Sequence, residues 1–285
     1  MEGNPLVSVI IPTNNRNKKL ANCLKSVFNS SYRNFEVIVV NDAPGNDVKA
    51  ALNGFHARLL QNKTNMLPAH CRNKGASVAK GKLLFFVDDD NVVDKECISK
   101  LVDAYKTHTG LIGPIMYDEH GTVWFSGARS NWINPNPKKV DISETKKQLI
   151  ETDVIPNAYL ISKQKYDAAG GENGVDFPTQ HEELDLAKRL SIKGYKHYIC
   201  TAASVIHDYK RVSDHVTNKQ IYYIAKNNIV IEKKYAPFGK RLVFYFLYLP
   251  AQFAFYLAVS IKIKKLGFFG SYIKGLKDGL LAKVE

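Results

Sequence analysis

The chain has 285 residues, of which 45% are hydrophobic, so it is long enough to bury one large core. Its 40 Lys and Arg residues outnumber its 27 Asp and Glu residues, and the formal net charge of +13 favours an anionic partner: nucleic acid, an acidic lipid surface or a phosphorylated small molecule. The 4 cysteines lie far apart, which excludes a zinc site of paired cysteines and indicates reduced core residues of a cytosolic protein.

The first hundred residues alternate strand and helix patterns. Apolar or β-branched runs predict strands at Val7–Ile11, Glu36–Val40 and Leu83–Val87, and helical spacing predicts helices at Lys19–Phe28 and Leu67–Ala79. Short, wholly apolar strands separated by helices are typical of a parallel sheet covered on both faces. Ligands of such sheets bind beyond the carboxyl ends of the strands, so the residues that follow each strand are the candidates for a site.

Beyond residue 110 the pattern is less regular. A hairpin is predicted from Leu111–Met116 and Thr122–Ser126, and a strand from Val154–Ser162. Asn131–Lys139 is rich in Pro, Asn and Lys and predicts a loop. Helices are predicted at Glu182–Lys193, ended by Gly194, and at His215–Lys234.

The 20 residues Leu242–Ile261 carry no charge, which is the length of a helix that crosses hydrocarbon. Lysine or arginine on both flanks leaves the orientation in a membrane open. Pro250 and Gln252 near the middle favour a kinked or interfacial arrangement over a simple span. A buried hairpin of a soluble domain is the alternative, and membrane contact is the favoured interpretation. We therefore expect a catalytic domain over residues 1–238 and a membrane-associated helical tail over 239–285.

The ends of the first two strands carry polar residues. Pro12 is expected to end the first strand, and Thr13 and the two following asparagines, among them Asn15, can hydrogen-bond a heterocycle or ribose; Arg16 completes this segment. Asp42, after the second strand, can accept from a ribose hydroxyl or a base N–H. Ordinary turn chemistry explains each of these residues equally well.

Three adjacent carboxylates, Asp88, Asp89 and Asp90, follow the third strand directly. They repel one another and are costly at the edge of a buried sheet unless a cation or hydrogen-bond donors neutralise them. A divalent ion that bridges them to a diphosphate is the natural solution. Capping of a helix that begins near Asp94, by Asp90 or Asn91, is the alternative, but it accounts for one aspartate and not for three.

Two basic side chains are candidates for the same site. Arg72, on the helix before the third strand, can reach the diphosphate or hold the carboxylates apart, and a surface salt bridge is the alternative. His207 follows the apolar run Ser204–Ile206 and can bind the metal or a phosphate, although an ordinary core or surface histidine has the same pattern.

A second acidic cluster begins the helix predicted at Glu182–Lys193. Asp185 and Arg189 are four residues apart and are expected to pair along one helix face. Glu182 and Glu183 fall in the first turn, where the helix dipole keeps carboxylates ionised, as a general base requires. A carboxylate that merely complements the dipole remains an equal alternative at this point.

Together these motifs resemble the family 2 glycosyltransferases with the GT-A fold, over nearly the whole length. The matching segments, in order, are Val7–Thr13, Val37–Asp42, Arg72–Gly75, Phe86–Asp90, Gly170–Gly171, Glu182–Leu186 with Arg189, Gly194–Tyr195 and His207. The resemblance implies an α/β fold, a Rossmann-like mixed sheet flanked by helices. It also implies a nucleotide-binding half over residues 1–110 and an acceptor and catalytic half over 111–238.

The resemblance further implies the roles of single residues. Asp42 would contact uridine or another base, and Asp88, Asp89 and Asp90 would be the DXD motif that holds Mg²⁺ or Mn²⁺ on the donor diphosphate. The base would be Glu183, where the family usually has Asp, with Glu182 as the second candidate. Absence of a Gln-x-x-Arg-Trp motif implies an enzyme that transfers a single sugar. The closing segment 273–280 resembles the membrane-associated tails of relatives that act on lipid-linked acceptors.

We therefore expect an inverting, metal-dependent glycosyltransferase of the hexosyltransferase type. Its expected partners are a nucleotide-diphosphate sugar, an acceptor glycan or lipid-linked glycan, and an anionic membrane surface contacted by residues 240–285. Nucleic acid is not expected, because the basic residues are dispersed or lie beside the apolar tail. Leu6–Ile11 lacks the flanks of a signal peptide, so the expected location is the cytoplasmic face of a membrane.

Three other classes of protein are alternatives to this expectation. A dinucleotide-binding oxidoreductase needs a glycine-rich turn after the first strand, and a nucleotidyltransferase needs a glycine-rich, arginine-containing loop there; the sequence has neither. A non-catalytic GT-A-like binding protein at the membrane remains the alternative, against which the intact acidic triplet argues.

Overall fold

A computed structural model of the chain describes residues 3–106, 108–129, 138–142, 147–207 and 217–284. The chain divides into two compact units, which are described separately. The first unit comprises residues 1–129, 139–174 and 182–209, and the second comprises 130–138, 175–181 and 210–285. Residues 210–238, assigned from the sequence to the catalytic domain, thus group with the tail. Most of the predicted loop Asn131–Lys139 lies outside the described residues.

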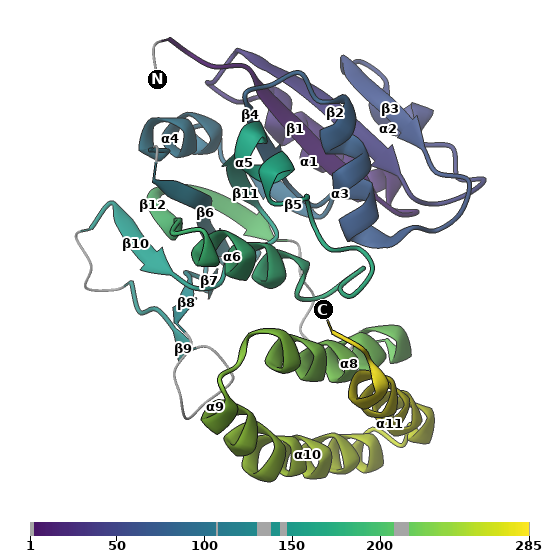
Figure 1. Ribbon diagram of the computed structural model, residues 1–285. Coiled ribbons are helices and arrows are strands. Elements are labelled where there is room, and N and C mark those ends of the chain that lie inside the picture. Colours follow the sequence, from purple (N-terminus) through teal and green to yellow (C-terminus); the bar gives the residue numbers. More distant parts are fainter. Residues whose placement is uncertain (1–2, 107, 130–137, 143–146, 208–216, 285) are drawn as a thin grey trace. The chain divides into compact units, whose positions relative to one another are not determined.

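The amino-terminal half of the first unit is a parallel sheet, as predicted (Figure 1). Its strands are β1 (Val7–Thr13), β2 (Phe35–Asn41), β3 (Ala57–Gln61) and β4 (Leu83–Phe86). They lie in the order β3-β2-β1-β4 and all neighbours run parallel. The carboxyl ends of β1, β2 and β4 therefore meet at one edge, where the candidate residues follow.

The rest of the sheet is mixed. The further strands are β5 (Asn91–Val93), β6 (Thr109–Tyr117), β7 (Val123–Phe125), β10 (Leu149–Thr152), β11 (Tyr159–Ser162) and β12 (Lys196–His207), with the short β8 (Ala128–Arg129) and β9 (Lys138–Lys139) outside this sheet. β11 runs antiparallel to β4, and β12 runs parallel to β6. The pair β6 and β7 is the predicted hairpin. The α/β sheet flanked by helices is confirmed.

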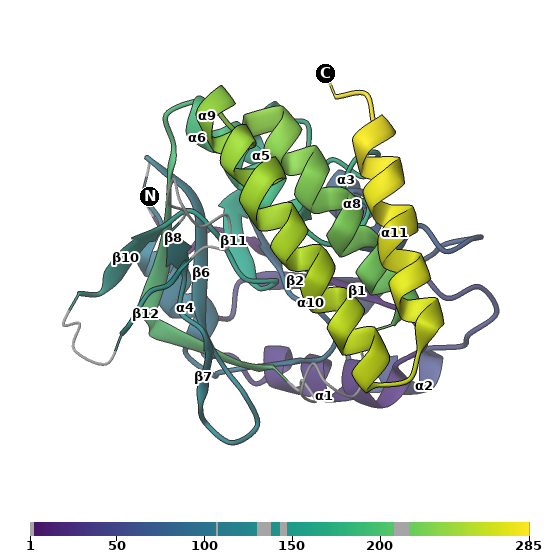
Figure 2. The same ribbon diagram turned by 90° about the horizontal axis from the view of Figure 1, so that it is seen from below.

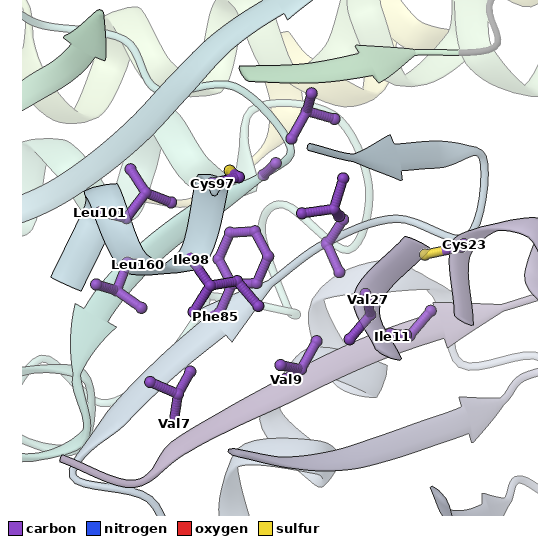
Figure 3. Packing of buried hydrophobic residues seen from close by; sticks show 14 of the residues in the cluster. Val7, Val9, Ile11, Cys23, Val27, Phe85, Cys97, Ile98, Leu101 and Leu160 are labelled. Carbon is purple, nitrogen blue, oxygen red and sulfur yellow. The ribbon is translucent and has the colours of Figure 1, made fainter. Parts of the chain in front are cut away.

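Helices cover both faces of the sheet because alternate residues of each strand point to opposite sides. The helices of this unit are α1 (Asn17–Phe28), α2 (Lys49–Leu52), α3 (Leu67–Val78), α4 (Cys97–Ala104), α5 (Lys163–Ala168) and α6 (Glu182–Ile192). Val9 and Ile11 of β1 pack with α1 and α4 in one core, as Figure 3 shows, whereas Ile10 belongs to a second core on the opposite face. All 4 cysteines are buried and free, in keeping with reduced core residues.

Two predicted strand limits are corrected by the structure, and both involve proline. Pro12 lies inside β1, which continues to Thr13. The strand tolerates this proline because β4 pairs with β1 only as far as Ile10, so no hydrogen bond from an N–H of residue 12 is lost. The strand predicted at Val154–Ser162 is reduced to β11. Pro156 interrupts it, and Val154 forms only an isolated bridge to Ala128.

The second unit consists mainly of helices: α8 (Asn218–Tyr235), α9 (Phe238–Val243), the π-helical turn η1 (Phe244–Tyr248), α10 (Leu249–Lys262) and α11 (Leu266–Leu281). A capping box of Thr217 and Gln220 begins α8. In Figure 2, α8, α10 and α11 lie beside one another, and Tyr272 of α11 is buried in the small core that they share.

The helix Phe238–Lys262, formed by α9, η1 and α10 together, is long and apolar enough to cross a membrane. Only 6% of its most apolar stretch is buried, which argues against the alternative of a buried hairpin. The π turn η1 ends at Tyr248, two residues before Pro250. π turns and prolines are both places where a helix can bend, in keeping with the kinked arrangement expected from the sequence. The apolar C-terminal helix expected from the sequence is confirmed.

Candidate active site

The end of β1 and the segment after β4 bind each other directly. Thr13 donates a hydrogen bond to Asp89 Oδ2 at 2.6 Å, and Arg16 Nε donates to the same oxygen at 3.2 Å. Arg16 Nη1 also pairs with Asp90 Oδ2 at 2.7 Å. Adjacent parallel strands thus bring together residues 73 to 76 positions apart in the chain. Thr13 donates a hydrogen bond to the triplet and Arg16 supplies positive charge to Asp89 and Asp90, whereas both were expected from the sequence to contact the nucleotide.

The three aspartates have different environments. Burial raises the pKa of Asp89 to about 7, although Arg16 and Thr13 oppose this shift. Burial also acts to raise the pKa of Asp90, but His207, Arg16 and Lys19 together hold it below its ordinary value. Asp89 is fully buried and braces the site from inside. Asp90 therefore favours the ionised form more strongly than Asp89 does.

Asp90 also faces His207, which ends β12. Asp90 Oδ1 lies 3.5 Å from His207 Nε2, because β12 pairs with β5 and brings His207 opposite Asn91. The ring of His207 packs against Trp124 with 4.7 Å between ring centroids. A carboxylate and an imidazole side by side fit a divalent cation whose other ligands are phosphate oxygens and water. Within the described ranges no three His, Cys, Asp or Glu side chains converge on one such point.

Asp88 faces in another direction. Its Oδ1 accepts from Arg72 Nη2 at 2.8 Å and its Oδ2 accepts from Asn157 Nδ2 at 2.9 Å. Within the triplet expected to hold the metal, the structure therefore brings Asp90 to His207 and Asp88 to Arg72. The capping alternative is wrong, because Asn91 begins a strand and α4 starts only at Cys97.

Arg72 is the centre of a buried cluster. Its side chain is 1% exposed, so the alternative of a surface salt bridge is wrong. Nη1 lies 2.9 Å from Glu183 Oε1, 3.2 Å from Glu172 Oε1 and 3.3 Å from Glu182 Oε1, while Nη2 contacts Asp88. Burial acts to lower the pKa of Arg72, but these carboxylates hold it well above its ordinary value. The guanidinium therefore stays charged and links the acidic triplet to α6.

Glu182 and Glu183 occupy the first turn of α6, as predicted, and the pair of Asp185 with Arg189 is confirmed at 2.8 Å. Glu182 is buried, and Glu183 is half-buried. Burial raises the pKa of Glu182 and of Glu183, with Arg72 acting in the opposite direction. The helix dipole favours ionisation of these glutamates, as expected from the sequence. Their burial adds a desolvation cost that opposes ionisation.

Asp42 has a structural role that the sequence analysis did not include. Its Oδ1 accepts from Asn62 Nδ2 at 2.8 Å and from the Met66 N–H at 2.7 Å, and its Oδ2 accepts from the Leu67 N–H at 2.9 Å. Asp42 is buried and orders the loop that leads into α3. The predicted contact of Asp42 with the base of the nucleotide would be a further hydrogen bond beside these three. Asn15, by contrast, is exposed at the site's edge, with a φ of +56°.

Three further residues of the site were not expected from the sequence: Glu172, Tyr159 and Asn157. Glu172 is fully buried against Arg72, and the Tyr159 hydroxyl donates to Glu172 Oε1 at 2.5 Å. The only signal in the sequence was a carboxylate directly after Gly170 and Gly171. No pattern in the sequence marks Tyr159 or Asn157, because their roles arise when β11 pairs with β4.

The comparisons with known proteins agree with this arrangement. Residues 8–164, more than half of the chain, match the family described as Glycosyl transferase family 2. The chain belongs to this family. GlyG of Streptococcus pneumoniae serotype 4 is 31% identical over 101 residues, and the match spans about a third of the length of each protein, 34% in both cases. EpsE of Bacillus subtilis is 25% identical over 241 residues, 81% of this chain and 82% of EpsE.

A third relative has a named substrate. The GalNAc(5)-diNAcBac-PP-undecaprenol beta-1,3-glucosyltransferase of Campylobacter jejuni is 26% identical over 126 residues, 42% of this chain and 41% of that protein.

Two solved structures share the fold. GalNAc-T7, solved with UDP, GalNAc and Mn²⁺, has a TM-score of 0.69 at 17% identity, over 86% of this chain and 50% of that one. The mannosyltransferase PcManGT of Pyrobaculum calidifontis, solved with GDP-Man and Mn²⁺, has a TM-score of 0.62 at 12% identity, over 98% and 88%. The fold is the GT-A fold of nucleotide-sugar transferases, as the resemblance implied.

Proposed function

We propose that the protein transfers one sugar from a nucleotide-diphosphate sugar to a hydroxyl of a lipid-linked glycan, with inversion and with a divalent metal. The observation that carries the proposal is the cluster around Arg72. It joins Asp88 of the acidic triplet to Glu183 at the start of α6, so a diphosphate site and a candidate base adjoin one another. Family membership supports the reaction class, and the nucleotide sugars and Mn²⁺ of the GT-A relatives support the donor class.

Asp90 and His207 are the residues that would hold the cation, Mg²⁺ or Mn²⁺, and the cation would supply positive charge to the leaving diphosphate. Thr13 at the end of β1 and Arg16 just after it hold Asp89 and Asp90 in place. Because Asp89 is fully buried beneath them, it fixes the backbone from which Asp90 projects.

The reaction itself is a single displacement. The acceptor oxygen bonds to the anomeric carbon as the bond from that carbon to the diphosphate oxygen breaks. The acceptor proton goes to Glu183, whose Oε1 is held by Arg72 at 2.9 Å. Glu183 is proposed as the base rather than Glu182 because its side chain is the more exposed, 14% against 6%. Inversion and transfer of a single sugar belong to this proposal.

The lipid-linked acceptor is proposed from two observations. The helix Phe238–Lys262 has the length and hydropathy to enter a membrane, and basic residues flank it at both ends. The relative from Campylobacter jejuni is named for an undecaprenol-linked substrate. We place the enzyme at the cytoplasmic face of a membrane, with residues 240–285 on anionic lipid.

The test is calorimetry of the purified protein against UDP-, GDP- and TDP-sugars, each with and without Mn²⁺. We expect one donor to bind in a metal-dependent manner, and the variant Asp90→Ala to lose the part of the affinity that depends on Mn²⁺. Asp167→Ala, which removes an exposed carboxylate of α5, is the matched control and should bind as the wild type does. A folded protein that binds none of the donors would favour the non-catalytic alternative.

A further inference from the structure

We propose that Glu172 is a positioning residue, which with Tyr159 fixes the Arg72 guanidinium against Glu183. The inference rests on the proposed function of Glu183 as the base. Glu172 touches neither the acidic triplet nor, in the proposed reaction, the substrate. Its effect on turnover would pass through Arg72.

Glu172 is locked to the helix that carries Arg72. Its Oε1 lies 3.2 Å from Arg72 Nη1 and its Oε2 lies 3.5 Å from the same nitrogen. Its backbone N–H donates to Asn73 Oδ1 at 2.9 Å, and Asn73 Nδ2 donates to its carbonyl at 2.7 Å. Because Asn73 is the neighbour of Arg72 on α3, these bonds set the register between Glu172 and the guanidinium.

The approach of this segment to α3 depends on the preceding glycine. Gly171 has a φ of +70°, and a Cβ atom there would lie 2.4 Å from Asn73 Oδ1. Arg189 of α6 donates to the Gly171 carbonyl at 2.8 Å, and the same Arg189 pairs with Asp185. The segment that carries Glu172 is thus held by α3 and by α6, the two helices that carry Arg72 and Glu183.

The charges of the cluster do not balance without a proton. One guanidinium faces four carboxylates, of Asp88, Glu172, Glu182 and Glu183, in a site from which water is largely excluded. Like charges this close disfavour one another's ionisation. The groups that face Glu172 are Arg72 on α3, Tyr159 on β11, Tyr166 on α5, and Glu182 and Glu183 on α6. Arg72 is the one cation among them.

The hydrogen bonds of Glu172 favour its ionised form, and Glu182 is the better place for that proton. Glu172 is fully buried, and its Oε1 accepts from Arg72 and, at 2.5 Å, from Tyr159. Burial raises the pKa of Glu172 to about 7 but that of Glu182 well above its ordinary value, and Glu182 Oε2 is buried without a hydrogen-bond partner among the described residues. With the proton on Glu182, the carboxylate of Glu172 holds the guanidinium of Arg72 together with Asp88 and Glu183.

The kinetic test compares Glu172→Gln with Glu172→Ala. Glutamine has the shape of glutamate and keeps an oxygen for Arg72 and Tyr159, so we expect kcat to fall by less than about tenfold. Alanine removes the carboxylate that contacts Arg72 and Tyr159. We therefore expect kcat to fall roughly 10- to 100-fold, with the donor KM within about twofold of wild type. Asp167→Asn, on an exposed carboxylate, is the control and should change neither quantity.

A second measurement does not require turnover. In protein labelled with ¹⁵N at the arginine side chains, the resonance that disappears in Arg72→Lys should keep its chemical shift in Glu172→Gln and move in Glu172→Ala, because Glu172 lies 3.2 Å from Arg72 Nη1. An unmoved Arg72 resonance in Glu172→Ala would overturn the inference, as would equal losses of kcat in Glu172→Gln and Glu172→Ala. If the protein binds donors but transfers no sugar, the proposed function fails, and the arginine resonance still decides whether Glu172 positions Arg72.

Discussion

The guanidinium of Arg72 has more acceptors around it than it has charge to neutralise. Among the three glutamates, Glu183 has the shortest contact with it, 2.9 Å, and the most exposed side chain. Glu182 and Glu172 face inward. At the scale of single residues, the site therefore contains one carboxylate that can reach a substrate and two that shape its surroundings.

The variant Glu183→Gln removes the base while it keeps an oxygen for Arg72. We expect kcat to fall roughly 10²- to 10⁴-fold, the range of a positioned general base, with donor binding unchanged by calorimetry. Asp167→Asn is again the control. Near wild-type turnover of Glu183→Gln would show that Glu183 is not the base.

The pH dependence of turnover follows from the same burial. The base must be ionised, and burial raises the pKa of Glu183 above its ordinary value of about 4.3. Activity is therefore lost as the pH falls through this raised pKa, and the acidic limb of kcat/KM should lie above pH 4.3. A limb at or below the ordinary value, measured at saturating metal, would contradict a desolvated base.

Most candidate residues could be located from the sequence because they follow apolar strands, and parallel strands end at a common edge. Thr13, Arg16 and Asp90 are brought together in this way. Glu172 could not be located, because its importance depends on the close approach of Gly171 to Asn73 across 98 residues of chain. Burial of Glu183 was missed for a similar reason, since a helix terminus in the sequence carries no sign of what covers it.

At the scale of elements, the second unit is held by a close helix pair. Cβ atoms added at Gly275 and Gly279 of α11 would lie 2.3 Å from the Tyr222 carbonyl oxygen and 2.8 Å from the Lys226 carbonyl oxygen of α8. Both glycines are buried. The closing segment 273–280, interpreted from the sequence as a membrane-associated tail, thus places one face against protein.

Substitution at these glycines should loosen the pair. Gly275→Ala forces a Cβ atom into backbone that cannot move aside, and we expect a loss of about 1–3 kcal/mol, measured by thermal unfolding of the full chain. Gly270→Ala on the same helix meets nothing within 4 Å and should leave stability unchanged or raise it by up to about 1 kcal/mol. Equal effects of the two variants would show that close packing at Gly275 contributes nothing.

Strands and helices were easier to predict than their limits. Alternation and helical spacing indicated β1, α1, α3 and α6 because each buries a regular apolar face. The limit of β1 was missed because Pro12 lies where the neighbouring strand has already ended. Whether a proline ends a strand depends on its partner strand, which the local sequence does not describe.

For the whole molecule, the apolar helix Phe238–Lys262 is the feature that sets where the enzyme would work. Phe246 and Leu247 on it are 73% and 68% exposed, large fractions for such side chains. Exposed aromatic and aliphatic residues next to lysines are typical of surfaces that enter the interfacial region of anionic bilayers.

The double variant Phe246→Ser, Leu247→Ser should weaken binding to vesicles that contain anionic lipid by at least about tenfold in flotation assays, since each large apolar side chain contributes roughly 1.5–3 kcal/mol on burial. Ile192→Ser, at an equally exposed position of α6, is the control and should bind normally. Undiminished binding of the double variant at physiological salt would leave only the basic residues to explain attachment.

The close contacts of the α11 glycines with α8 also affect how well this helix pair stays together when its surroundings change from water to lipid. Close packing of backbone against backbone is stabilised by van der Waals contacts, which persist in hydrocarbon. Packing of aliphatic side chains is stabilised by the hydrophobic effect, which is absent in hydrocarbon. A pair joined through Gly275 and Gly279 can therefore keep its geometry in buffer, in detergent and at the rim of a bilayer. The neighbouring apolar helix can then exchange water for lipid while the pair beside it stays assembled.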